Sequence, residues 1–448
     1  MRVIVIGAGE VGSSVAASLC DEHEVVVVDV DSDRVDALTY DLDVLAIEGD
    51  GAAIETLRDA GLESAELLIA VTDDDETNIV SCGTAKTIDD VTTIARVRNT
   101  KFLDTWQHAE GALGVDVMVG TNLLTARKIA SIIGLPAARD VDSFADGTIQ
   151  MAEFELAADS PVAGQTVAEA DRFADLTFAA VLCPDEDGDC EEIVIPRGDT
   201  VLEAGHEVIV IGTDEAVTAF SHDVAPDDDY HDVLLVGGSS VGHQTARLLE
   251  ERGIRARLIE RDPERAQTLA ESLPKTTVLQ ADATDRDFLE REHIDDVDVV
   301  VTTLESDEQN LLAGLLAKRL GADRAIAVVE DRSYVSLFET VGIDVAVQPR
   351  EVAAEEITRF TREEHTENVA ILESDRAEVI EIEIDDDSVF AGRPIREAAG
   401  DLPDGVVVGA ITRDGEFVRP RGDTVVEVGD HVVVFVEADV LTDTLAQI

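Results

Sequence analysis

Short apolar runs rich in Val, Ile and Leu recur at regular intervals near the start of the chain. Uninterrupted runs of this length are typical of parallel strands that are buried on both faces. More polar stretches with helical character begin between them, near Gly12, Asp33, Ile54 and Thr77. This alternation predicts an α/β fold with a doubly wound parallel sheet of the Rossmann type. The predicted strands are Val3–Ile6, Val25–Val28, Val44–Ile47, Leu67–Val71 and Thr93–Val97.

The second half of the chain repeats the first. Pro-Arg-Gly-Asp-Thr begins at Pro196 and again at Pro420, 224 residues later. A glycine-rich turn ends at Gly12, and its counterpart ends at Gly242, 230 residues later. Two further anchors fall between these in the same order, so we interpret the chain as a tandem duplication of one two-part unit. They are Asp-Asp-Glu-Thr-Asn78 with Ser-Asp-Glu-Gln-Asn310, and Asp159–Gly164 with Asp387–Gly392.

Each unit is predicted to contain a Rossmann-like domain followed by a small β-rich α/β module. Connecting helices are expected at Asn122–Gly134 and Glu351–Phe360. The small modules show short strands between Gly and Pro turns and end in apolar strands at Glu207–Ile211 and His431–Val436. The predicted boundaries are 1–120 (Rossmann-like domain), 121–150 (connecting helix and linker), 151–218 (small module), 219–229 (linker), 230–349 (second Rossmann-like domain), 350–369 (connecting helix) and 370–448 (second small module).

Acidic residues outnumber basic ones along the whole chain. There are 97 Asp and Glu against 34 Lys and Arg, and the formal net charge is −63. Because the acids are not gathered in a tail, we expect an extreme halophile, whose salt-rich cytosol screens the self-repulsion. The charge excludes nucleic acid as a partner, because phosphate binding requires clustered Lys and Arg. No apolar run reaches the ~18 residues of a membrane span, and the scattered cysteines predict no disulfide framework, so we expect a cytoplasmic protein.

A glycine loop between the first strand and the first helix is the strongest candidate for binding chemistry. A tight turn, close backbone approach and free N–H groups at a helix start are what a pyrophosphate needs. Asp29 ends the second strand, where a carboxylate accepts hydrogen bonds from both ribose hydroxyls of an adenosine. Its charge disfavours a 2′-phosphate, which favours NAD over NADP. The loop consists of Gly7, Ala8, Gly9, Glu10, Val11 and Gly12.

Further polar residues fall at the carboxyl ends of the predicted strands, where open α/β sheets bind ligands. Arg96 has two open interpretations, since it is suited to balance phosphate charge or to pair with one of the nearby acids. Glu10 stands inside the glycine loop and disfavours ATP, because its charge repels a terminal phosphate. The candidates beyond the loop and Asp29 are Asp50, Thr72, Asp73, Asn78 and Arg96.

The second half carries a weaker copy of this site. Ser239 stands where the second loop glycine is expected, so close backbone approach is less free. Val328 replaces Arg96, and Leu304 replaces Thr72. Either nucleotide binding is retained here, or the fold is kept as a support alone. The candidate residues are Gly237, Gly238, Ser239, Ser240, Val241, Glu260 in the role of Asp29, and Asp282 in the role of Asp50.

Residues suited to catalysis are not grouped in the sequence. There is no Gly-x-Ser-x-Gly, no lysine in a phosphate loop and no cluster with metal-ligand spacing. The repeat places Asp430 opposite His206 and Glu207 opposite His431. Neither histidine therefore has a histidine at the equivalent position of the other half, which argues against a shared catalytic acid or base. We therefore predict ligand binding without turnover, no catalytic residue and no metal site. An NAD-dependent oxidoreductase is the alternative from another class.

The motifs together resemble the TrkA family, the peripheral regulatory subunits of Trk-type potassium uptake, and more broadly the regulator-of-potassium-conductance family. The resemblance covers nearly the full length and implies that Gly7–Val11, Asp29, Thr72, Asp73 and Arg96 hold the nucleotide. The implied ligand is NAD(H), with ATP or ADP left open. The matching segments are GAGEVG at Gly7–Gly12, VVDVD around Asp29, VTDDDETN at Val71–Asn78, IARVR at Ile94–Arg98, and the paired PRGDT turns.

The resemblance also implies partners. It predicts a homo-oligomeric ring, expected to be a tetramer, that docks at the inner face of the cell membrane beneath a TrkH-like potassium-translocating subunit. The departures from the family pattern, at Ser239 and Val328, fall mainly in the second half. Regulation of a potassium-efflux channel or antiporter by the same domains is the alternative within this class.

Overall fold

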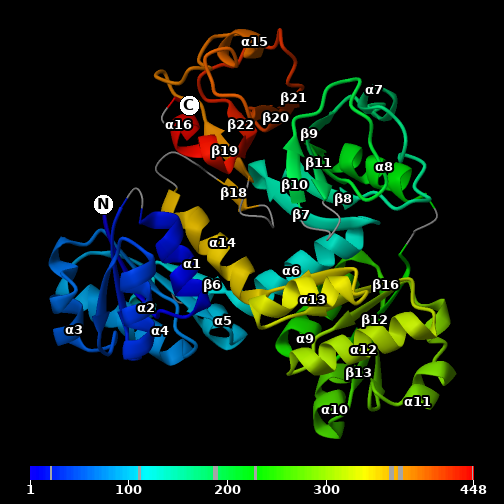
Figure 1. Cartoon of the computed structure of the whole chain (residues 1–448). Helices are drawn as coiled ribbons and strands as arrows, with labels where there is room; N and C mark the ends of the chain where they lie inside the picture. Colours follow the sequence, from blue (N-terminus) through cyan, green and yellow to red (C-terminus); the bar gives the residue numbers. More distant parts are fainter. Residues whose placement is uncertain are drawn as a thin grey trace. The chain divides into compact units, whose positions relative to one another are not determined.

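Each half of the chain builds one six-stranded sheet followed by one five-stranded sheet. The computed structural model describes residues 1–20, 23–108, 112–184, 190–226, 230–362, 368–371, 377–445 and 447–448. The six-stranded sheets and their helices form one compact unit (1–127, 234–295 and 300–360), and the five-stranded sheets form another (128–233, 296–299 and 361–448). The helices and strands are labelled in Figure 1.

The first six-stranded sheet is parallel and has the strand order β3-β2-β1-β4-β5-β6. The order reverses direction between β1 and β4, which opens a crevice at the carboxyl ends of these strands. Its strands are β1 (Arg2–Ile6), β2 (Glu24–Asp29), β3 (Leu45–Glu48), β4 (Leu67–Ala70), β5 (Thr92–Val97) and β6 (Val117–Gly120). Its helices are α1 (Glu10–Leu19), α2 (Ser32–Asp41), α3 (Ile54–Asp59), α4 (Asp75–Ile88) and α5 (Thr100–His108).

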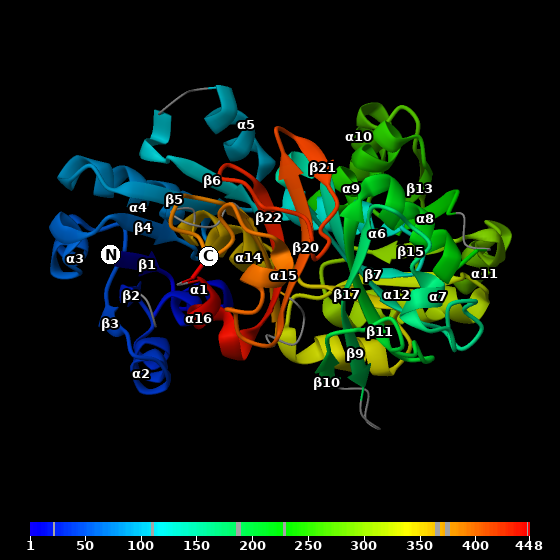
Figure 2. The same ribbon diagram turned by 90° about the horizontal axis from the view of Figure 1, so that it is seen from above.

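Alternate residues of these strands pack into two apolar layers, one on each face of the sheet. Val3, Val5 and Val27 face α1 and α2, whereas Ile4 and Val26 face α3, α4 and α5. Figure 2 shows α1 and α2 on one side of the sheet and α4 and α5 on the other. The uninterrupted apolar runs in the sequence follow from this burial on both faces.

The second six-stranded sheet has the equivalent order, β14-β13-β12-β15-β16-β17. Its strands are β12 (Asp232–Val236), β13 (Arg255–Glu260), β14 (Thr277–Gln280), β15 (Val299–Thr302), β16 (Arg324–Val328) and β17 (Val345–Val347). Its helices are α9 (Ser240–Arg252), α10 (Pro263–Ser272), α11 (Arg286–Arg291), α12 (Asp307–Leu320) and α13 (Val335–Thr340).

The five-stranded sheets are antiparallel and again share one order, β10-β9-β11-β8-β7 and β21-β20-β22-β19-β18. Within their unit the two sheets share one apolar core, to which Met151, Ile209, Val379 and Phe435 contribute. The strands are β7 (Ala138–Phe144), β8 (Ile149–Glu155), β9 (Leu176–Pro184), β10 (Cys190–Val194), β11 (Glu207–Thr213), β18 (Asn368–Ile371), β19 (Ala377–Glu383), β20 (Val406–Arg413), β21 (Glu416–Val418) and β22 (His431–Glu437). The helices are α7 (Val167–Ala170), α8 (Asp214–Val224), α15 (Ile395–Ala398) and α16 (Leu441–Leu445).

The helices that follow the six-stranded sheets are α6 (Thr121–Gly134) and α14 (Pro349–Arg362). Although α14 follows the second sheet, it packs against the first: Ala354 and Ile357 belong to the same buried cluster as Val15 of α1. The Ser18 and Thr358 hydroxyls lie 3.3 Å apart. Figure 1 shows α14 beside α1. The first Rossmann-like domain is therefore covered by a helix from the other half of the chain.

Three segments differ from the elements expected from the sequence. β6 is an additional strand that pairs with β5. β7 occupies much of the segment that was expected to be a linker after the first connecting helix. α8 continues to Val224, inside the second expected linker, of which 227–229 lie outside the described residues. Within the described residues, no helix has the length and apolar character needed to cross a bilayer.

Candidate functional site

The glycine loop connects β1 to α1 and is held by contacts that only glycine permits. Gly7 has φ +108°, and its N–H donates to the Val28 carbonyl at 2.8 Å. A Cβ on Gly12 would lie 1.8 Å from the Gly7 carbonyl oxygen. A Cβ on Gly9, in contrast, would meet nothing nearer than an Arg34 guanidinium nitrogen at 3.6 Å. Gly7 and Gly12 therefore shape the loop, whereas Gly9 leaves space above it.

Helix α1 presents free backbone donors to that space. Its N-cap is Gly9, which has no side chain to accept a hydrogen bond from the first turn. Unsatisfied N–H groups and the positive end of the helix dipole together form an anion site. The first turn also carries Glu10, a negative charge beside this site.

Asp29 lies at the end of β2 and supports the loop. Its two carboxylate oxygens accept hydrogen bonds from the Ala8 N–H at 2.6 Å and the Asp31 N–H at 2.8 Å. A carboxylate oxygen accepts more than one hydrogen bond, so the side chain can also receive ribose hydroxyls. Asp50 is held similarly at the end of β3, where it accepts the Ala52 N–H at 2.9 Å.

Asn78 ties three elements together beneath the crevice. Its Oδ1 accepts the Thr72 N–H at 2.8 Å and the Thr72 hydroxyl at 2.7 Å, and its Nδ2 donates to the Arg96 carbonyl at 2.8 Å. The side chain is fully buried. Asn78 thus positions Thr72 and the end of β5.

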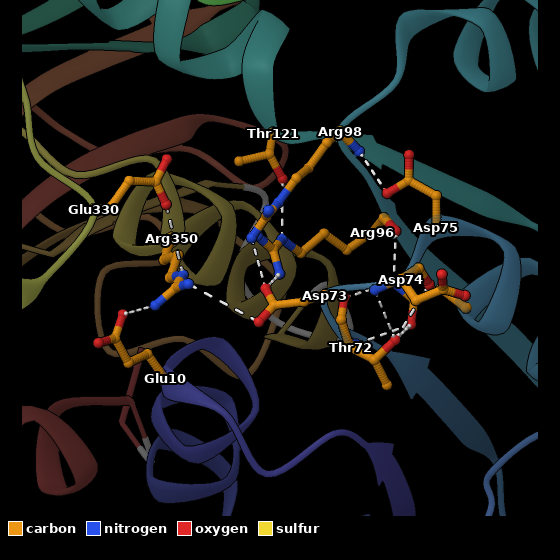
Figure 3. A network of polar contacts seen from close by, with 11 residues as sticks. Glu10, Thr72, Asp73, Asp74, Asp75, Arg96, Arg98, Thr121, Glu330 and Arg350 are labelled. Atoms are coloured by element: carbon orange, nitrogen blue, oxygen red, sulfur yellow. Dashed lines mark hydrogen bonds and ion pairs between the residues drawn. The ribbon is translucent and has the colours of Figure 1, made fainter. Parts of the chain in front are cut away.

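Three arginines converge on Asp73 (Figure 3). Arg98 Nη2 lies 2.6 Å from Asp73 Oδ1, Arg96 Nη1 lies 3.6 Å from the same oxygen, and Arg350 Nη2 lies 3.9 Å from Oδ2. Arg96 is only 2% exposed, and its Nε donates to the Thr121 hydroxyl at 3.1 Å. Burial lowers the pKa of Arg96, as do the charges of Arg98 and Arg350, while Asp73 opposes them. The mutual repulsion of the arginines favours a further anion here.

One cavity of about 910 Å³ is lined by the glycine loop, Asp29, Asp73, Arg96 and Arg350. Its volume lies within the range of ~300–1,000 Å³ typical of small-molecule sites. The predicted residues that it brings together are Gly7, Ala8, Gly9, Glu10, Val11, Asp29, Asp50, Thr72, Asp73 and Arg96. Gly12 and Asn78 are not among the lining residues. Gly12 instead permits the close packing of the loop, and Asn78 holds Thr72 by hydrogen bonds.

Two lining arginines were not among the residues proposed from the sequence. Arg34 lies in the first turns of α2, just after Asp29, so its place beside the loop follows from the βαβ pattern. Arg350 comes from α14, and its Nη1 lies 2.8 Å from Oε2 of Glu10, which is 340 residues away in the chain. The sequence around the glycine loop gives no signal for Arg350.

The second half contains a comparable cavity of about 920 Å³. Gly237 has φ +104°, and Glu260 accepts the Gly238 N–H at 3.0 Å, as Asp29 accepts that of Ala8. Asp282 accepts hydrogen bonds from the Thr284 N–H and hydroxyl. These hydrogen bonds, that of the hydroxyl first, lower the pKa of Asp282. Of the predicted residues, Gly237, Gly238, Ser239, Ser240, Glu260 and Asp282 line the cavity, and Val241 lies behind Ser240 in the chain.

The second cavity differs from the first where a phosphate would bind. Ser239 caps α9, because its hydroxyl accepts the Gly242 N–H at 3.2 Å. Val328 occupies the position of Arg96. Arg265 lies instead beside the loop and the ribose end, where its Nε donates to the Gly238 carbonyl at 2.6 Å and is 3.7 Å from Glu260. The first cavity is therefore the better anion site.

The histidines of the small modules have local roles. His206 Nδ1 accepts the Glu203 N–H at 3.2 Å within a turn, and His431 Nδ1 lies 3.4 Å from Glu381. Among the described residues, His293, Asp295 and Asp296 form one group with metal-ligand spacing, and all three are exposed.

Two domain families match the chain, each of them twice. The TrkA-N domain matches residues 3–120 and 233–349, and the TrkA-C domain matches 151–223 and 379–448. The match boundaries follow the tandem repeat in which each six-stranded sheet precedes a five-stranded one.

Similar proteins cover nearly the whole chain. The Trk system potassium uptake protein TrkA homolog 1 of Methanosarcina mazei is 36% identical over 97% of both chains. The Trk system potassium uptake protein TrkA of Halomonas elongata is 34% identical over 97% of this chain and 96% of its own. The solved structure of the GsuK channel bound to NAD covers 99% of this chain and 79% of its own, with a TM-score of 0.61 and 18% identity, and shares the fold.

Proposed function

Because this chain belongs to the TrkA family, we propose that it is a nucleotide-binding regulatory subunit that gates a membrane potassium-uptake transporter. One observation carries this proposal: a single cavity joins a glycine loop, an uncapped helix start, Asp29 and the buried Arg96. Such a group of residues suits the binding of a nucleoside diphosphate, and we propose that it binds its ligand without turnover.

The proposed ligand of the first cavity is NAD(H). Its adenosine ribose hydroxyls would donate to Asp29, and its pyrophosphate would lie at the start of α1 near Arg96 and Arg350. Asp29 disfavours the 2′-phosphate of NADP by charge repulsion. The neutralisation of Glu10 by Arg350 removes part of the repulsion against ATP or ADP, so these remain competing ligands. The NAD-bound GsuK channel, which shares the fold, supports the dinucleotide.

We further propose that the second cavity binds a nucleoside ligand more weakly, through Glu260 and Asp282. The capped start of α9 and Val328 in place of Arg96 leave less attraction for phosphate there. The domain boundaries expected from the sequence are retained as part of the proposal, with 138–150 assigned to the first small module because β7 pairs with β8.

The proposed site of action is the inner face of the cell membrane. A homo-oligomeric ring, with a tetramer as the expected size, would dock beneath a TrkH-like potassium-translocating subunit. Ligand binding biases the transporter if the ring has two arrangements with different ligand affinity, and a coupling of about 1–3 kcal/mol suffices. The strongly negative surface would meet basic cytoplasmic loops or apolar patches of the partner.

The function is tested by potassium flux through the cognate membrane subunit in vesicles, with and without this protein and NADH. We expect flux to depend on NADH only when the protein is present, and nicotinamide absorbance to stay constant. Absorbance that falls with turnover of an added substrate would instead establish an oxidoreductase. Flux that ignores both protein and ligand would refute the regulatory role.

A further inference from the structure

One arginine in the first cavity comes from the second half of the chain. Arg350 is the second residue of α14, and its Nη1 contacts Glu10 at 2.8 Å. Its Nη2 lies 3.9 Å from Asp73, and its Nε lies 3.9 Å from Glu330, which follows β16 of the second sheet (Figure 3). The guanidinium is therefore shared between the phosphate end of the first cavity and the second Rossmann-like domain.

The contact between Arg350 and Glu10 is poised to respond to a phosphate. Glu10 is the first residue of α1, so its carboxylate lies beside the free N–H groups that would bind the ligand. A phosphate arriving there meets Glu10 as a repulsive neighbour and Arg350 as an attractive one. A guanidinium binds phosphate through two parallel hydrogen bonds, which is a better match than the single close contact to Glu10.

The charges around Arg350 agree with this role. Burial works against its charge, but the hydrogen bond to Glu10 and the charges of Asp73 and Glu330 raise its pKa. The side chain is 25% exposed, so a ligand in the cavity can reach it. Arg350 thus stays charged whichever acid it faces. Only the anion that pairs with it can change.

The repeat provides an internal comparison. Because α6 and α14 begin at equivalent residues, Asn122 corresponds to Arg350, and Ser240 at the start of α9 corresponds to Glu10. Asn122 and Ser240 line one shallow hollow, so the same approach of helix to loop exists there. Both residues are uncharged. The charged pair is therefore a special property of the first cavity and is not required for α6 to lie beside the second loop.

We propose that Arg350 reads the phosphate charge of the nucleotide in the first cavity. When a diphosphate binds at α1, the guanidinium exchanges Glu10 for a phosphate oxygen, and α14 transmits this exchange to the second half through its start beside Glu330. The inference rests on the proposed function, because it takes a nucleotide as the ligand of this cavity. It adds that the nucleotide site is incomplete without the second half of the chain.

The test is calorimetric titration of the full chain with ADP. Arg350→Gln is expected to weaken ADP binding by about tenfold or more, because a charge-assisted hydrogen bond is lost. Glu10→Gln is expected to strengthen it, because a repulsive charge is removed and Arg350 is released. The matched control is Arg359→Gln on the same helix, whose ion pair with Glu356 stays within α14, and it should leave the affinity unchanged.

The opposite signs separate a reading role from a purely structural one. If Arg350 only fastens α14 to α1, then Arg350→Gln and Glu10→Gln both break that link and shift ADP affinity in the same direction, which would overturn the inference. Equal affinity in Arg350→Gln and wild type would overturn it as well. A wild-type protein that binds no ADP and no NADH would refute the proposed function itself, and the inference with it.

Hydrogen exchange gives a second readout. In the wild type, ADP is expected to change exchange at the start of α14, over residues 349–353, and Arg350→Gln should abolish this change while Arg359→Gln retains it. An identical response to ADP in all three proteins would show that α14 does not depend on Arg350, contrary to the inference.

Discussion

Replacement of Asp29 by Asn tests the ribose end of the first cavity. The substitution keeps the size of the side chain but removes its charge and exchanges one acceptor oxygen for an NH₂ group. Asp29 now accepts the Ala8 N–H at 2.6 Å and the Asp31 N–H at 2.8 Å, so the amide also lacks an acceptor for one of them. Both the loop support and the acceptors offered to the ribose are reduced.

The expected magnitude follows from the hydrogen bonds to the charged group. One charge-assisted hydrogen bond contributes about 1.5–3 kcal/mol. At roughly 1.4 kcal/mol for each factor of ten, NADH affinity should fall about 10- to 150-fold. NADPH should respond in the opposite direction, since a unit charge ~4 Å from its 2′-phosphate costs between about 1 and 4 kcal/mol at the protein surface.

Calorimetric titrations of wild type and Asp29→Asn with NADH and NADPH measure both effects. Glu260→Gln is the matched control, because it makes the same change at the equivalent position of the second cavity. We expect the preference for NADH over NADPH to collapse in Asp29→Asn and to persist in Glu260→Gln. Unchanged NADH affinity and unchanged preference in Asp29→Asn would refute the assignment of the ribose to this carboxylate.

Three further predictions concern stability and reactivity. Gly12→Ala should lower the free energy of unfolding by about 1–3 kcal/mol, because its Cβ would lie 1.8 Å from the Gly7 carbonyl oxygen. Gly9→Ala should instead keep stability and lose nucleotide affinity. Equal thermal unfolding temperatures for the two variants would contradict the loop geometry. The Cys82 thiol is buried, and burial, followed by the charge of Asp116, raises its pKa to about 12, so a maleimide should label it only after unfolding, and fast labelling of the folded protein would argue against this burial. Dilution from molar salt into low salt should unfold a chain of net charge −63, as followed by circular dichroism, and cooperative structure that persists there would oppose the halophilic interpretation.

Much of the fold follows from local sequence patterns. Val3–Ile6 and Val25–Val28 become the central strands β1 and β2 because both faces of the sheet are covered, which an uninterrupted apolar run requires. β7 escaped prediction because it includes Asp140, a buried acid whose pKa is raised by burial despite the Lys128 ammonium 2.5 Å away. Because the partner of this buried acid comes from a different element, the hydrophobic pattern of the strand alone does not reveal that it is buried.

The first site was predictable wherever its chemistry is local to a strand end. The glycine loop, Asp29 and Arg96 were proposed because open α/β sheets gather ligands at the carboxyl ends of their strands. The structure brings these residues to one cavity, and their role in binding stays a prediction. The sequence indicated the repulsive charge of Glu10 but not the arginine that neutralises it, because Arg350 lies 340 residues away in the chain. A contact of this range depends on the path of α14 across the first domain, which no local pattern encodes.

The proposed regulation requires that a nucleotide occupies the first cavity. A structure determined with saturating NADH tests this directly. We predict density for the ADP-ribose portion with its pyrophosphate at the start of α1, its ribose hydroxyls on Asp29, and the Arg350 guanidinium on a phosphate oxygen. An empty first cavity, or a dinucleotide bound elsewhere on the chain, would contradict the account.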